Sequence, residues 1–128
     1  MTDYLVFDRS ETEDGICSWD ALASPNASHS LRLLDQTAAL LQHLQQQLGP
    51  PGPLEEGHDW DLDLQVHDAR QQTWPWDWSA WTPQAHGHGQ RPALPAGRLT
   101  LALSVCVSAS GQQVASRVLE GPANPPTH

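Results

Sequence analysis

Apolar and polar residues alternate most regularly in two stretches of the chain, residues 58–67 and 99–107. In the first, Trp60 and every second residue up to Val66 are apolar, and the positions between them are acidic or polar. In the second, leucine and valine occupy the odd positions. A period of two turns one set of side chains toward a core and the other toward solvent. We therefore predict two half-buried strands that pair side by side, with their apolar faces on the same side of a sheet.

A longer period marks residues 28–48 as an amphipathic helix. Pro25 to Ser28 break the preceding element and supply capping residues, and Gly49 followed by two prolines ends the helix. Burying six leucines at about 1.5–3 kcal/mol each contributes on the order of 10 kcal/mol before the entropic cost is subtracted, so we expect this helix to cover the sheet. The leucines on the apolar half of the helix are Leu33, Leu34, Leu40, Leu41, Leu44 and Leu48.

The N-terminal residues predict a β-hairpin. Residues 3–8 are a short run of β-formers, and residues 16–24 again alternate between apolar and polar positions. Between them lies Asp14-Gly15, a turn dipeptide in which the glycine can adopt positive φ.

The sequence pattern near the C-terminus does not by itself decide the secondary structure. Residues 110–119 fit either a helix or a strand, but Ser110 as a cap and two valines four residues apart favour a short helix. The predicted fold class is therefore α+β, an antiparallel sheet of four to five strands with one long helix, at about 28–48, and a short C-terminal helix packed on one face.

The chain of 128 residues is the size of one domain. Proline and glycine concentrate in a few places, so we expect part of the chain to lie outside the packed body. Residues 1–121 are predicted to form a single α+β domain with a Trp/Pro/Gly/His-rich insertion at about 70–97. Residues 122–128 are predicted to be a disordered tail.

The net charge of −9 narrows the possible partners. Residues 1–78 carry a balance of −11 and residues 79–128 a balance of +2, and every basic residue is an arginine. An acidic protein repels phosphate backbones and anionic membrane surfaces, so we expect neither nucleic-acid nor membrane binding. A cationic partner, a metal ion or solubility alone each fits the charge, and solubility is the simplest explanation.

Sequence features also suggest a location. The N-terminus has neither the basic region nor the long apolar stretch of a signal peptide, and no segment approaches the ~20 apolar residues of a membrane span. Cys17 and Cys106 lie far apart without a C-x-x-C spacing, which is typical of reduced thiols in a cytosolic protein. We expect a cytoplasmic protein.

Two clusters are candidates for binding chemistry. The first is the acidic strand, where a divalent metal is an alternative to a solvated, charged sheet face. One ion can bridge only two of its aspartates, because alternate residues on a strand are ~7 Å apart. The glycine and glutamate that an EF-hand needs at positions six and twelve are also absent. The potential ligands are His58, Asp59, Asp61, Asp63 and His67, with His86 and His88 in a nearby loop.

The second cluster is the tryptophan-rich segment, in which Trp74, Trp76, Trp78 and Trp81 surround Asp77. The first three rings would share one face of a short strand, and Pro75 would confine that strand to the edge of the sheet. Exposed tryptophan is unfavourable, so these rings are expected to be covered. They can pack on the domain itself or in a dimer, contact a protein partner, or stack on a sugar or an amine with Asp77 contributing charge.

We find no motif for nucleophilic catalysis or for phosphate binding. The preferred hypothesis is a non-catalytic interaction module without a cofactor, a homodimer or a binder of another protein, that uses the tryptophan segment, the open face of its sheet, or both. The alternatives are a metal-binding protein or metal-dependent hydrolase that uses the acidic strand, and a module for a small ligand that uses the tryptophan cluster.

Overall fold

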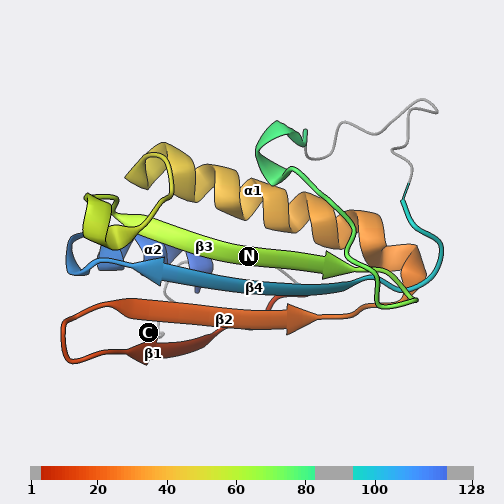
Figure 1. The fold of residues 1–128 in the computed structure, drawn as a ribbon, viewed down its shortest axis with the longest axis horizontal. Helices are drawn as coiled ribbons and strands as arrows, with labels where there is room; N and C mark the ends of the chain where they lie inside the picture. Colours follow the sequence, from red (N-terminus) through yellow and green to blue (C-terminus); the bar gives the residue numbers. More distant parts are fainter. Residues whose placement is uncertain (1–3, 83–93, 121–128) are drawn as a thin grey trace, which may run out of the picture.

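The computed structural model describes residues 4–82 and 94–120. It confirms the α+β fold, with an antiparallel four-stranded sheet in the order β1-β2-β4-β3, one long helix and one short C-terminal helix (Figure 1). The predicted tail at 122–128 and the histidines His86 and His88 lie outside the described residues. The elements are β1 (Asp8–Glu11), β2 (Cys17–Ala23), α1 (Ser30–Leu48), β3 (Trp60–His67), β4 (Thr100–Val107) and α2 (Gln112–Leu119).

The two alternating stretches pair as predicted. β3 and β4 are antiparallel neighbours, with Trp60 opposite Val107 and Val66 opposite Leu101. These four side chains are buried, and opposed residues project to the same face of a sheet. The apolar sides of both strands therefore face one core.

The N-terminal hairpin forms, but its first strand is not where the sequence predicted it. Residues 4–7 of the expected strand at 3–8 precede β1, which is the polar segment Asp8–Glu11. The turn decides this register, because the amide of Thr12 donates to the carbonyl of Ile16 at 2.9 Å and the amide of Gly15 donates to that of Thr12 at 3.1 Å. Gly15 has a φ of +83°, as expected for this turn. Strand formation at 8–11 thus follows from the turn rather than from β-propensity.

Tyr4, Leu5 and Phe7, before β1, pack on the core instead, whereas Val6 is exposed. Leu5 is 5% exposed and belongs to the hydrophobic core. The Tyr4 hydroxyl and Nδ1 of His29, at the start of the long helix, are 2.6 Å apart. Tyr4 and Leu5 are therefore tied to the helix layer and the core.

Both helices lie on one side of the sheet. α1 begins at Ser30, after a 3-10 turn at Ala27–His29, and supplies fully buried leucines at four positions, Leu33, Leu34, Leu41 and Leu44. α2 contacts α1 and buries Ala115 and Leu119, so the ambiguous C-terminal segment is helical. The opposite face of the sheet carries neither α-helix, and only the short 3-10 helix at Leu54–Glu56 lies at one end of it among the described residues (Figure 1).

Candidate functional site

The tryptophan segment does not form the predicted fifth strand. Its backbone makes one isolated bridge with the sheet, Thr73 to His67, and then turns into a 3-10 helix at Trp78–Ala80. Pro75 has no N–H group with which to continue a ladder. The segment instead lies against α1 (Figure 1).

Gln42 of α1 anchors this segment. Its Nε2 donates to the carbonyl oxygens of both Trp78, at 2.8 Å, and Trp81, at 2.7 Å. The indole N–H of Trp81 donates to Oδ1 of Asp35 at 2.7 Å. Three hydrogen bonds to one helix therefore position the end of the segment.

The rings of the segment extend the core of the domain. All four are half-buried and pack against it. The ring centroids of Trp78 and the buried Trp60 lie 6.4 Å apart. Those of Trp76 and Trp81 lie 5.6 Å apart, in an edge-to-face arrangement. Such arrangements add to the stability that burial itself provides. Packing within the domain, one of the expected alternatives, thus accounts for the buried parts of these rings.

Asp77 has a local structural partner. Its Oδ1 accepts hydrogen bonds from the hydroxyl and the amide of Ser79, at 2.6 and 3.1 Å. These bonds, the hydroxyl first, lower the pKa of the Asp77 carboxyl. The carboxylate caps the 3-10 helix, a role that needs no ligand.

The five candidate metal ligands do not converge. Within residues 4–82 and 94–120, no group of three or more histidine, cysteine, aspartate or glutamate residues is arranged to hold a metal ion. His58 lies beside the carbonyl oxygen of Pro50, with Nδ1 3.2 Å away, and His67 is at the opposite end of β3. Oδ1 of Asp59 accepts a 3.4 Å hydrogen bond from Ser110. Asp61 and Asp63 alone belong to a larger feature, the open face of the sheet.

That face carries a row of carboxylates across four strands. The register puts Asp8 of β1 opposite Asp20 of β2, Asp20 opposite Ser104 of β4, and Ser104 opposite Asp63 of β3. The Ser104 hydroxyl donates to Asp20. The sequence pattern points only to Asp63 of this row, because alternation assigns each residue to a face but does not identify its neighbours on other strands.

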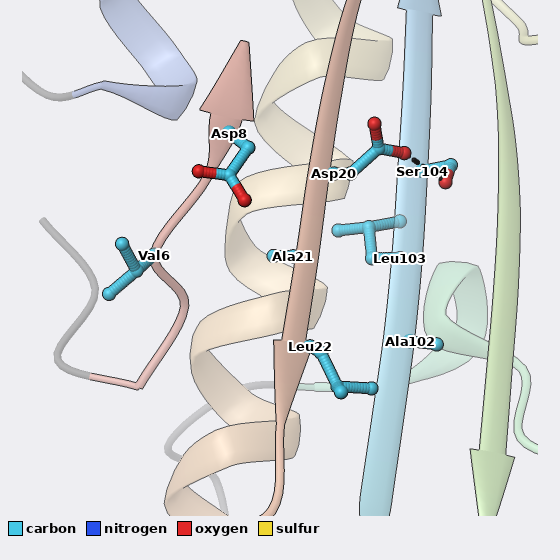
Figure 2. Close-up of a pocket in the computed structure, with 8 residues that line it drawn as sticks. All are labelled: Val6, Asp8, Asp20, Ala21, Leu22, Ala102, Leu103 and Ser104. Carbon is cyan, nitrogen blue, oxygen red and sulfur yellow. Dashed lines mark hydrogen bonds between the residues drawn. The ribbon is translucent and has the colours of Figure 1, made fainter.

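A hollow of about 490 Å³ lies beside this row (Figure 2). Asp8, Asp20 and Ser104 form its acidic end, and its apolar end includes Val6 and Leu22. These two side chains are the exposed large hydrophobic residues of the described chain, 79% and 70% exposed. The hollow combines the two kinds of surface that a protein partner can contact.

A second hollow of about 340 Å³ lies on the other side of β4. It shares Ser104 with the first hollow, and Glu55, Asp61 and Asp63 contribute its charge. The remaining lining residues are Ile16, Leu54, Leu62 and Cys106. We call the surface formed by the two hollows and the carboxylate row the open face.

The described arginines are engaged elsewhere or lie on other elements. Arg9 alternates with the open-face positions of β1, and its guanidinium lies 5.7 Å from the ring centroid of the buried Trp19. Arg98 donates to Asn26 at 3.2 Å. Arg32 and Arg117 belong to the helices, and Arg70 to the turn after β3. None of the described residues that line the two hollows is an arginine, so the linings contain no positive charge to offset the carboxylates of the open face.

No protein-family model matches the chain, and no curated protein or solved structure matches it either. Among the described residues, no helix has the length and apolar character required to cross a membrane.

Proposed function

We propose that this chain is a non-catalytic interaction module that binds a protein partner through the open face. One observation carries the proposal. Val6 and Leu22, the exposed large apolar side chains among the described residues, flank a single hollow on the sheet face opposite both α-helices. Such residues on one concave surface are typical of contact sites for other molecules.

The contacts of the tryptophan segment support the choice of this face. Its hydrogen bonds to Gln42 and its ring contacts with Trp60 give the segment a role within the domain. The open face has no comparable internal partner among the described residues. A cytoplasmic location is part of the proposal, in keeping with the two free cysteines.

We favour a different protein over a second copy of this chain as the partner. Two open faces in contact would oppose their aspartates, and like charges that lose their solvent repel more strongly. Self-association through another surface stays a separate prediction.

Site-specific photocrosslinking tests the proposal. A photoreactive amino acid replaces Leu22 in the full chain, and in a control variant it replaces Gln46, an exposed residue of α1. When cells that express the protein are irradiated, we expect a discrete adduct with another protein from the Leu22 position and none from the Gln46 position. Equal labelling from both positions, or no adduct from Leu22, would contradict the proposal. An adduct with the mass of two copies would replace it with self-association.

A further inference from the structure

We infer that the open face receives a single extended, cationic segment of the partner, with its basic side chains directed to the aspartates on both sides of β4. This inference deepens the proposed function and rests on it. Charge, shape and size each support it.

Asp8 and Asp20 give the open face negative charge that a cationic segment would balance. They are directly opposite each other on neighbouring strands, an arrangement that is unfavourable for like charges. The Ser104 hydroxyl bonds to Asp20, but within the described residues neither Asp8 nor Asp63 has a hydrogen-bond or ion-pair partner. A guanidinium or ammonium group would relieve this repulsion and supply the missing donors.

β4 is the strand of the open face along which the two hollows meet. Its side chains on this face are small, Ala102, Ser104 and Cys106, and the two hollows meet at Ser104. Asp20 and Asp63 flank Ser104 from the neighbouring strands, so their backbones are about 10 Å apart at two strand spacings. That width accommodates one extended chain above β4.

The size of the face supports a segment over a globular partner. Three spacings of ~4.8 Å between the four strands and a length of about eight residues at ~3.4 Å rise cover roughly 400 Å². A standard interface between folded proteins buries about 800 Å² on each side. The open face is therefore suited to a short segment, with an apolar side chain on Leu22 and basic side chains above Ser104 and Cys106.

A synthetic peptide of this pattern tests the inference. The probe is fluorescein-labelled Ser-Leu-Ser-Arg-Ser-Arg-Ser-Leu-Ser, which presents leucine and arginine on one side when extended and reads the same in both directions. We expect saturable binding to the full chain by fluorescence anisotropy, and none for the peptide with glutamate in place of arginine. The double variant D8N/D63N should weaken binding about fivefold to tenfold, because it removes two exposed charge interactions and breaks no internal hydrogen bond.

A matched control separates this site from general attraction to an acidic protein. The variant E13Q/E56Q also removes two exposed carboxylates, but neither of them lines a hollow. Its binding should equal that of the unmodified chain. Equal weakening in both double variants would overturn the inference. Absence of peptide binding alongside a Leu22 crosslink to another protein would overturn the cationic segment and leave the proposed function standing. If neither peptide binding nor a Leu22 crosslink is observed, the cationic segment and the proposed function are both contradicted.

Discussion

Individual side chains of this protein are best understood through the partners of their polar atoms. Trp19 and Trp60 are fully buried, as their positions in alternating strands predicted. The indole N–H of Trp19 donates to Oε2 of Glu120 at 2.8 Å, and that of Trp60 donates to the carbonyl of Gly49 at 2.7 Å. A buried donor without a partner costs about 1–3 kcal/mol, and these two hydrogen bonds avoid that cost when the rings are buried.

Gly49 gives the first prediction at this scale. Its φ of +85° and ψ of −172° belong to a region that only glycine adopts readily, whereas Gly57, at +97° and 3°, is in a left-handed region that other residues tolerate better. A Cβ would meet no atom within 4 Å at either position, so backbone strain alone separates the two. We expect Gly49→Ala to lower the free energy of unfolding by about 2–3 kcal/mol and Gly57→Ala by about 1 kcal/mol. Urea denaturation measures both, and equal losses would refute the distinction.

At the scale of elements, α1 organises the domain on two sides. Its buried leucines cover the sheet, and its polar Gln42 holds the tryptophan segment. The pattern of leucines was sufficient to predict the first contact. The second depends on one amide side chain that meets two backbone carbonyls, for which no periodic signal exists.

Gln42→Ala tests this second contact. It removes two hydrogen bonds, so we expect a loss of about 1–3 kcal/mol in the free energy of unfolding. We also expect a red shift of tryptophan emission, because the rings of the freed segment gain contact with water. Gln46→Ala, at an exposed position one turn further along α1, is the matched control and should change neither quantity. Unchanged emission in the Gln42 variant would show that ring packing alone holds the segment.

The whole molecule carries a large uncompensated negative charge. Its net charge is −9, and within residues 4–82 and 94–120 the ion pair identified is Arg9 with Glu11, at 3.4 Å and solvent-exposed. Exposed pairs contribute at most about 1 kcal/mol. Repulsion among carboxylates therefore dominates the electrostatic contribution to folding.

Stability should accordingly rise with ionic strength. Salt screens repulsion between exposed charges, and the Debye length falls from about 30 Å at 0.01 M to about 8 Å at 0.15 M. We expect Tm to increase by about 3–6 °C between these concentrations of sodium chloride, measured by circular dichroism. Potassium chloride should act equally, because ionic strength is the cause. A fall in Tm would mean that attractive pairs outweigh the repulsion.

Local patterns were enough to predict the two long strands, the helix that covers them and the hairpin turn at Gly15, because each depends on the spacing of residues close together in the chain. They misplaced β1, where the geometry of the turn outweighed the β-propensity of residues 4–7. Folding alone brought Asp8, Asp20, Ser104 and Asp63 into one row, and it laid the tryptophan segment on α1. Periodicity determines the direction in which a side chain points. Which distant residue lies beside it depends on strand order and register, and those are set by the packing of the whole chain.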